Sequence, residues 1–184
     1  MRSFTQFQPW KKNGSTNDIP RTFLRDCLPY LSIHLCELFN MSISESIFPD
    51  SFKLAYVTPV HKKGPKDDVR NYRPISIISN LSKVFETLIH NRLSKFFYGK
   101  QLLSENQFGF RRGKSTELAC LSLVDRVLPA FADKGYAICV FLDFSACFDT
   151  VDREMIIAKL DRYGISNWPL ELVKSYFTID KGIG

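Results

Sequence analysis

The sequence lacks the long apolar runs that membrane-spanning and secreted proteins carry. Its longest uninterrupted apolar run, Tyr136–Leu142, has seven residues, whereas a helix that crosses a bilayer needs about 20. The first residues, MRSFTQFQPWKK, include basic side chains but no apolar segment behind them, so no secretory signal is visible. We therefore expect an intracellular protein, cytoplasmic or nuclear, that is neither secreted nor inserted in a membrane.

Paired cysteines and clustered metal ligands are also missing. The five cysteines are odd in number and form no C-x-x-C pair, a pattern that favours small buried thiols in a reducing compartment over a disulfide framework. The three histidines share no ligand spacing with one another or with the cysteines, so we expect no zinc site. What remains is an ordinary globular composition, with 45% hydrophobic and 24% charged residues in 184, enough for one domain or for one domain and part of another.

The positive charge is concentrated in the middle of the chain. The net charge is +6 overall, but residues 50–114 alone carry +8, whereas residues 1–49 carry +1 and residues 115–184 carry −3. A concentrated basic surface is typical of proteins that bind polyanions. A lysine-rich solvated face would give the same count, so the charge by itself leaves both interpretations open.

Hydrophobic periodicity predicts an α+β fold. Residues 53–60 and 72–78 alternate between apolar and polar side chains, which predicts two strands of a hairpin whose tip, residues 61–71, is rich in lysine and arginine. Pro59 places the first strand at an edge or a bulge. The run Tyr136–Leu142 is apolar on both alternating faces, so we expect a strand buried within a sheet that helices cover.

Helical spacing of apolar residues accounts for most of the remaining sequence. It predicts helices on either side of Pro29, and a further helix from residue 80 that Asn80 caps. A helix from about residue 115 should be kinked or shortened by Pro129 and ended by Gly135. Two short helices are expected at 153–163 and 168–177.

Asp143 is the most informative single residue of the sequence. It stands at the end of the apolar run 136–142, where an unpaired buried carboxylate would be costly. Such a residue is paired, binds a metal ion or lies at a solvated opening, although an aspartate that caps the following turn fits the local sequence equally well.

The segment around Asp143, FLDFSACFDTVDR, resembles the first catalytic motif of the reverse transcriptases of non-LTR (LINE-type, jockey-like) retrotransposons. Three further blocks resemble that family in the same order and at similar spacing. They are VTPVHKKG (57–64), NYRPIS followed by LSKVFE (71–76 and 81–86), and QFGFRRGKST (107–116). The resemblance extends from about residue 14 to about residue 176, and it implies a fragment of an RNA-directed DNA polymerase from a mobile element.

The resemblance implies a role for each matching residue. Asp143 and the backbone carbonyl of Phe144 would bind two Mg²⁺ ions, and Phe148 would exclude the 2′-hydroxyl of a ribonucleotide unless it is simply a core aromatic. The expected partners are an RNA template, a DNA primer and deoxynucleoside triphosphates, while the oligomeric state is left open. The expected triphosphate-binding residues are Lys62, Lys63 and Arg73. The expected nucleic-acid-binding residues are Arg111, Arg112 and Lys114.

The sequence departs from the family pattern in one respect that affects activity. The second metal-binding motif of the family, an aromatic-x-Asp-Asp hairpin, is absent. We therefore expect part of a right-hand polymerase, with a poorly ordered start (1–17), a fingers-like region (18–135) and an incomplete first part of the palm (136–184), which is inactive alone. Asp143 should face the basic hairpin tip across one cleft. A nucleic-acid-binding remnant without catalysis, or an inert pseudogene product, is the alternative.

Overall fold

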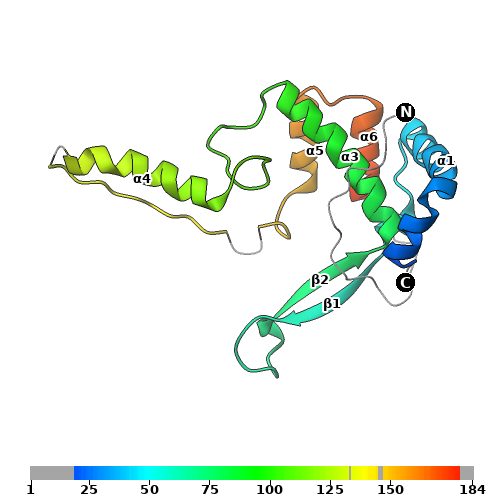
Figure 1. The fold of residues 1–184 in the computed structure, drawn as a ribbon, viewed down its shortest axis with the longest axis horizontal. Helices are drawn as coiled ribbons and strands as arrows, with labels where there is room; N and C mark the ends of the chain where they lie inside the picture. Colours follow the sequence, from blue (N-terminus) through cyan, green and yellow to red (C-terminus); the bar gives the residue numbers. More distant parts are fainter. Residues whose placement is uncertain (1–18, 133, 145–146, 179–184) are drawn as a thin grey trace. The chain divides into compact units, whose positions relative to one another are not determined.

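The computed structural model describes residues 19–132, 134–144 and 147–178 of the chain. Within them the fold combines helices with a two-stranded antiparallel sheet, so the predicted α+β class is confirmed (Figure 1). The described residues form two compact units, unit 1 with residues 19–91 and 153–178, and unit 2 with the described part of 92–152. The start of the chain, residues 1–17, lies outside the described residues. The elements are α1 (Arg21–Glu45), α2 (Asp50–Lys53), β1 (Ala55–His61), a 3₁₀ turn (Val69–Asn71), β2 (Tyr72–Ile78), α3 (Asn80–Gly99), α4 (Thr116–Ala132), α5 (Arg153–Arg162) and α6 (Trp168–Phe177).

Strands β1 and β2 form the predicted hairpin, in a register that places Pro59 opposite Pro74. The backbone N–H of Lys62 donates to the carbonyl of Asn71 at 2.7 Å. Because hydrogen-bonded pairs alternate along an antiparallel ladder, the two prolines fall at a pair whose N–H groups would point away from the partner strand. Neither proline therefore removes a hydrogen bond from the hairpin, and both strands are edges, as the sequence predicts for the first.

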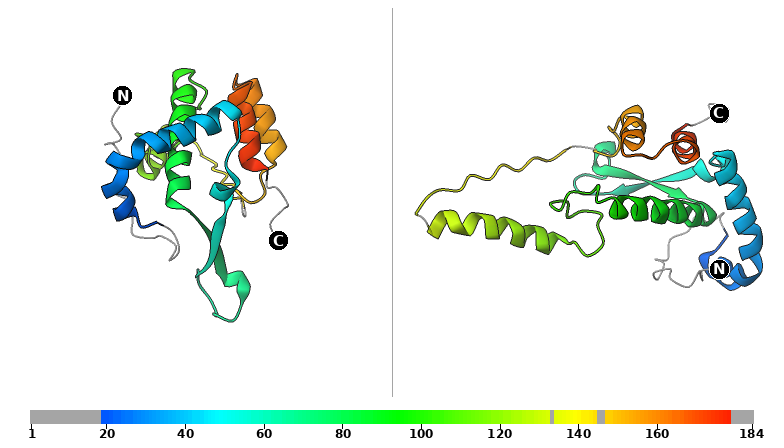
Figure 2. Two further views of the ribbon diagram at one scale, coloured as in Figure 1. Left: turned by 90° about the vertical axis from the view of Figure 1, so that its right-hand side faces the viewer. Right: turned by 90° about the horizontal axis from the view of Figure 1, so that it is seen from above.

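Pro29 lies inside a helix and does not separate two helices. α1 continues from Arg21 to Glu45 through Pro29, so the prediction of two helices is wrong. A proline removes one backbone donor and bends a helix whose neighbouring turns are held by packing, and the α1 ribbon changes direction in its first third (Figure 2). The helix ends where Ser46 adopts a left-handed backbone, with a φ of 59°.

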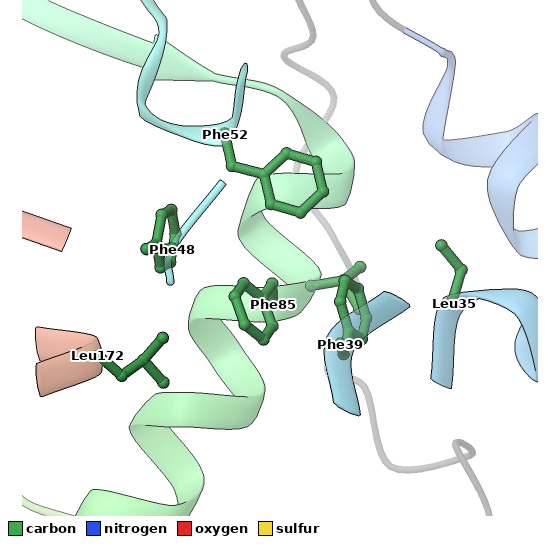
Figure 3. Packing of buried hydrophobic residues seen from close by; sticks show 7 residues of the cluster. Leu35, Phe39, Phe48, Phe52, Phe85 and Leu172 are labelled. Atoms are coloured by element: carbon green, nitrogen blue, oxygen red, sulfur yellow. The ribbon is translucent and has the colours of Figure 1, made fainter. Parts of the chain in front are cut away.

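The core of unit 1 is largely aromatic (Figure 3). Phe85 of α3 stacks on Phe39 of α1 with ring centroids 4.7 Å apart, and it lies 5.2 Å from Phe48. Phe52 of α2 meets the other rings edge-on. Leu172 of α6 closes the cluster, so segments from both ends of the chain stabilise one core through apolar burial and ring packing.

The predicted cap of α3 is one residue away from the observed one. The Ser79 hydroxyl accepts a hydrogen bond from the backbone N–H of Ser82 at 3.0 Å, which is the bond an N-cap makes. Asn80 is instead buried, donating to the carbonyl of Ile19 and accepting from Nε of Arg21. Its amide joins the start of α1 to the start of α3, and the prediction that Asn80 caps the helix is wrong.

The two short helices at the end of the described chain form as predicted. α5 ends at a turn in which Gly164 has a φ of 91°, a conformation that glycine adopts without steric cost. α6 follows, and the Ser175 hydroxyl accepts a hydrogen bond from the backbone N–H of Phe48 at 2.9 Å. The helix is thereby fixed against the segment between α1 and α2.

In unit 2, the apolar side chains along one face of α4 (Thr116–Ala132) are not buried by other described residues. α4 continues through Pro129 without a break, and Gly135 donates to the carbonyl of Ala130 just beyond its end, as predicted for a terminating glycine. The stripe that predicted the helix is exposed within the described residues. Its members are Leu118, Leu121, Val124, Leu128 and Phe131.

Residues 136–142 do not form the buried strand that their apolar sequence predicts. The segment is extended (Figure 1), but it pairs with no strand among the described residues and its side chains are exposed. Tyr136, for example, is 97% exposed. A strand needs a neighbour for its backbone and a helix or sheet for its apolar faces, and the described residues supply neither.

Two further expectations concern the cysteines and membranes. All five cysteines are free, but Cys36, Cys120, Cys139 and Cys147 are exposed and Cys27 is only partly buried, so the prediction of buried thiols is wrong.

None of the helices in the described part of the chain combines the length and the apolarity that a bilayer crossing demands.

Candidate nucleotide and nucleic-acid site

The hairpin tip presents cationic side chains without internal ion pairs. Lys62, Lys63 and Arg73 are exposed, and within the described residues none of their side chains makes an ion pair or hydrogen bond. Arg70 differs, because its guanidinium binds both carboxylate oxygens of Asp68, the closest contact being 2.9 Å. This pairing lowers the pKa of Asp68 and raises the pKa of Arg70. The three residues predicted to bind a triphosphate therefore carry charge that no described side chain neutralises, and Lys66 of the tip shares this property.

The backbone of the tip is held by local hydrogen bonds. The Asn71 amide donates to the carbonyl of Pro65 at 2.8 Å, and the Tyr72 hydroxyl donates to the carbonyl of Lys66 at the same distance. Gly64 has a φ of 87°, and a Cβ there would lie 2.8 Å from the Asn71 amide nitrogen. Since only glycine fits this turn, the tip holds its lysines on a defined backbone.

A second basic group lies in the loop between α3 and α4, and a single carboxylate engages two of its three members. Glu105 contacts the Arg111 guanidinium at 3.3 Å and the Lys114 ammonium at 3.4 Å. These hydrogen bonds and charges lower the pKa of Glu105. The Arg112 side chain is exposed and makes no such contact within the described residues.

Arg111 is integrated into the loop. Its side chain is nine-tenths buried, and its guanidinium carbon lies 5.8 Å from the ring centroid of Tyr98. The Tyr98 hydroxyl in turn accepts the backbone N–H of Arg112 at 3.1 Å. Within the loop, Arg111 fixes the conformation from which Arg112 projects.

The segment around Asp143 is open. The Asp143 carboxylate is exposed and has no ion pair or hydrogen bond among the described residues. Phe144 is exposed, and residues 145 and 146 of the motif lie outside the described residues. The Phe148 ring meets the Phe110 ring edge-on, with centroids 5.8 Å apart and planes at 88°.

The contact between Phe110 and Phe148 joins two of the sequence motifs. Phe110 belongs to the block 107–116 and has a φ of 58°. Residues other than glycine, asparagine and aspartate rarely adopt this backbone conformation. Its ring is 91% exposed despite the contact. The structure thus brings the loop motif and the Asp143 motif together within unit 2 through two aromatic rings that solvent can reach.

The oxygen atoms at Asp143 and Phe144 are of the type that binds a hard divalent cation, but they are too few to hold one alone. A carboxylate and a backbone carbonyl are the oxygen ligands that Mg²⁺ prefers. The described residues contain no group of three or more histidine, cysteine, aspartate or glutamate side chains that could hold a metal ion. Asp143 therefore fits as one ligand of a site that needs further donors.

The structure does not bring all predicted site residues into one unit. Lys62, Lys63 and Arg73 belong to unit 1, whereas Asp143 and the loop arginines belong to unit 2. A cleft shared by the hairpin tip and Asp143 stays a prediction.

Two residues that position the site were not recognised in the sequence. Glu105 is the sole acidic residue of the sequence between positions 87 and 116. Its isolation among basic residues could have predicted that it pairs with some of them. The sequence offers no comparable indication for Tyr98, because an amphipathic helix pattern does not show that one of its tyrosines contacts the following loop.

Comparison with known proteins decides the family. Residues 60–183 match the family described as "Reverse transcriptase (RNA-dependent DNA polymerase)". The chain belongs to the reverse transcriptase family. This match includes the hairpin tip, the loop motif and the Asp143 motif.

The relatives of this reverse transcriptase chain come from non-LTR mobile elements, as its motifs indicate. It is 36% identical over 156 residues to the probable RNA-directed DNA polymerase from transposon BS of Drosophila melanogaster, which is 84% of this chain and 17% of the relative. It is 34% identical over 129 residues to the RNA-directed DNA polymerase from mobile element jockey of the same species, 70% of this chain and 14% of the relative. It is 31% identical over 142 residues to a Pol polyprotein from the type-1 retrotransposable element R1 of Bradysia coprophila, 76% of this chain and 14% of the relative. The chain thus spans about a sixth of the length of these relatives.

Proposed function

We propose that this chain contributes the nucleotide-binding part of an RNA-directed DNA polymerase, with residues 18–135 as fingers and residues 136–184 as the first part of the palm. The observation that carries the proposal is the Asp143 carboxylate, which lies in the segment that resembles the family's first catalytic motif, is exposed, and has no partner among the described residues. A carboxylate that forms no hydrogen bond or ion pair with any described residue is available to an external cation. The names of the relatives, as RNA-directed DNA polymerases of mobile elements, support the same activity.

Asp143 and the backbone carbonyl of Phe144 would hold Mg²⁺. Reverse transcriptases use divalent metal ions, and a bound Mg²⁺ stabilises developing negative charge on phosphate oxygens and lowers the pKa of a hydroxyl. The role of Asp143 would be to bind and orient the metal ion, since its carboxylate accepts no hydrogen bond from any described residue that would have to break first.

The exposed cations would bind the phosphates of the substrates. Lys62 and Lys63 of the tip and Arg73 at the start of β2 carry charge that no described residue neutralises, which suits the triphosphate of a deoxynucleotide. Arg112 would contact the phosphate backbone of the RNA template or DNA primer, while Arg111 and Lys114, engaged by Glu105, would reach phosphate only by exchanging that partner. Phe148 would exclude the 2′-hydroxyl of a ribonucleotide.

The metal site can be tested with Mn²⁺, which takes the same oxygen ligands as Mg²⁺ and broadens the NMR signals of nearby residues. With dATP present, we expect broadening of the amides around residue 143. Asp143→Asn should abolish that broadening, and Asp149→Asn, a matched change six residues along, should not. Equal broadening in wild type and Asp143→Asn would contradict the proposal.

A nucleic-acid-binding remnant is the second candidate, which the +8 charge of residues 50–114 favours, and primer extension, salt-dependent binding and the Mn²⁺ experiment together distinguish it from the enzyme fragment. We expect no extension of a DNA primer on RNA by this chain alone, because Asp143 is one carboxylate where two metal ions need several. Binding of the template–primer should weaken steeply with salt, and Arg112→Ala should reduce the slope of log K against log[salt] by about 0.7–0.9. Binding without any Mn²⁺ effect at Asp143 would favour the remnant.

A further inference from the structure

Lys66 lies in the hairpin tip, which projects from the helices of unit 1 (Figure 1, Figure 2). The Asn71 amide donates to the carbonyl of Pro65 at 2.8 Å, and the Tyr72 hydroxyl donates to the carbonyl of Lys66 at 2.8 Å. These two carbonyls belong to the peptide groups on either side of the Cα atom of Lys66. Because peptide groups are planar, holding both of them fixes the backbone of Lys66 and the direction in which its side chain leaves the tip.

The neighbouring contacts of the tip support the same conformation. His61 Nε2 donates to the carbonyl of Gly64 at 2.9 Å, so three successive carbonyl groups accept hydrogen bonds from side chains at the base of the tip. His61 and Tyr72 are opposite each other in the last pair of the hairpin, and their rings meet edge-on with centroids 5.2 Å apart. All of these partners belong to the hairpin itself, so this conformation needs no other part of a polymerase.

The ammonium group of Lys66 is not engaged within the tip. Its side chain is exposed and forms no ion pair or hydrogen bond with a described residue. Of the two carboxylates in the tip, Asp68 is bound by the Arg70 guanidinium at 2.9 Å, and Asp67 is exposed and forms no ion pair with a described residue. The tip therefore presents the charge of Lys66 on a fixed backbone, where an external anion can bind it.

We propose that Lys66 is a further triphosphate-binding residue and that Asn71 and Tyr72 are its positioning residues, which rests on the proposed binding of a deoxynucleotide triphosphate at the tip. A lysine ammonium group can donate three hydrogen bonds to phosphate oxygens. Fixing the backbone from which it extends lowers the conformational entropy that binding costs. The block 71–76 then serves one ligand in two ways, since Arg73 would bind phosphate and the two residues before it hold Lys66 in place.

Binding of inorganic tripolyphosphate to the 184-residue chain, followed by NMR shifts of the backbone amides, tests the role of Lys66. Lys66→Gln should weaken binding about two- to fivefold, the range expected for an exposed ion pair. Lys159→Gln makes the same change at an exposed lysine of α5 in unit 1 and should leave the affinity unchanged. Equal effects of the two variants would mean that only the overall charge matters and would overturn the proposal.

The positioning role has its own test. Tyr72→Phe removes the hydroxyl and keeps the ring, and it should weaken tripolyphosphate binding by no more than Lys66→Gln does. Tyr56→Phe is the matched control in β1, because the Tyr56 hydroxyl makes no hydrogen bond to a described residue. In a Lys66→Gln chain, Tyr72→Phe should have no further effect, since a positioning residue acts only through the residue that it positions. Asn71→Ala should behave in the same way.

An undiminished effect of Tyr72→Phe in the Lys66→Gln chain would show that its hydroxyl supports the hairpin in general. That result, or equal affinities of Tyr72→Phe and Tyr56→Phe, would overturn the positioning role. Far-UV circular dichroism checks that every variant folds.

A single-stranded RNA with a 5′-hydroxyl end distinguishes a triphosphate from backbone phosphates. We expect Lys66→Gln to change RNA affinity no more than Lys159→Gln does. Weaker RNA binding with unchanged tripolyphosphate binding would assign Lys66 to the template and overturn the proposal. If Lys62→Gln weakens tripolyphosphate binding and Lys66→Gln does not, the proposed function stands and the role of Lys66 fails. No tripolyphosphate binding by the wild type would overturn both roles of the tip, while the Mn²⁺ experiment at Asp143 tests the metal site independently.

Discussion

The two units of this chain use similar apolar sequences with opposite results. All ten hydrophobic residues that are buried among the described residues belong to unit 1, and none belongs to unit 2. Unit 2 nevertheless contains the most apolar run of the sequence and a helix with a continuous apolar stripe. The units differ in whether their described residues include other segments that pack on these apolar surfaces.

Helices α3 and α4 show this most directly. Both were predicted from apolar residues at helical spacing, and both form. Phe85 and Val84 of α3 are buried by residues from α1, α2 and α6, which come from both ends of the chain. The stripe of α4 has no such partners in its unit. Periodicity therefore predicts which face of a helix can be buried, while burial itself depends on partners remote in sequence.

The largest effect should come from truncating the centre of the aromatic core. Phe85→Ala should lower the free energy of unfolding of unit 1 by about 3–5 kcal/mol, because Phe85 is fully buried and loses its contacts with Phe39 and Phe48. Phe131→Ala, at an exposed phenylalanine of α4, should change it by less than about 0.5 kcal/mol. Urea denaturation followed by circular dichroism measures both, and similar losses would erase the contrast between the units.

A buried hydrogen bond should give the next largest effect. The Ser82 hydroxyl is fully buried and donates to the carbonyl of Phe52 at 2.7 Å, linking α3 to α2. Ser82→Ala should cost about 1–3 kcal/mol, since it leaves a buried acceptor without this donor. Ser44→Ala removes a hydrogen bond of similar type on the exposed side of α1 and should cost far less. The same denaturation series compares them, and equal costs would show that burial does not set the difference.

Much of the fold was predictable where the determining interactions are local. The alternation of residues 72–78 gave the bounds of β2, and Gly164 marked the turn between α5 and α6. Predictions failed where packing outweighs local preference. Pro29 was expected to divide a helix that continues through it, and Asn80 was expected to cap a helix although its amide is used to join α1 to α3. Neither outcome is encoded in the neighbouring residues.

The candidate site divides in a similar way. Motif spacing identified the basic tip and Asp143, but a count of positive charges could not show which cations are already paired. Arg111, Arg112 and Lys114 are near neighbours in sequence, yet Glu105 engages the first and the last and leaves Arg112 free among the described residues. Such pairing depends on how the loop folds back on itself.

A smaller effect on stability should come from Glu86 of unit 1, and this effect should depend on pH. Glu86 is half-buried and accepts a hydrogen bond from the Tyr176 hydroxyl at 3.1 Å, and burial raises its pKa. A raised pKa means that the folded state keeps a proton which the unfolded state has lost, so this residue makes the protein less stable as pH rises from the ordinary glutamate range through the raised pKa. Glu86→Gln should remove that decline.

The difference in unfolding free energy between Glu86→Gln and wild type should be near zero at about pH 4 and should grow towards pH 7. Solvent screening of a half-exposed group keeps it below about 1 kcal/mol. Tyr176→Phe should steepen the decline, because the hydrogen bond it removes lowers the pKa of Glu86. A difference that is independent of pH would contradict the assignment of the effect to the carboxyl proton.

The smallest effect tests unit 2 and depends on its proposed role in binding nucleic acid. Glu105→Gln removes the charge that engages Arg111 and Lys114, so both cations become available to phosphate. Affinity for single-stranded RNA at low salt should rise about two- to threefold, and the salt slope should steepen by about 0.7 for each released cation. Glu117→Gln is the matched control, since Glu117 hydrogen bonds to Ser115 and forms no ion pair within the described residues. Weaker RNA binding by Glu105→Gln would mean that Glu105 is needed to order the loop from which Arg112 projects, and that structural support outweighs the charge it neutralises.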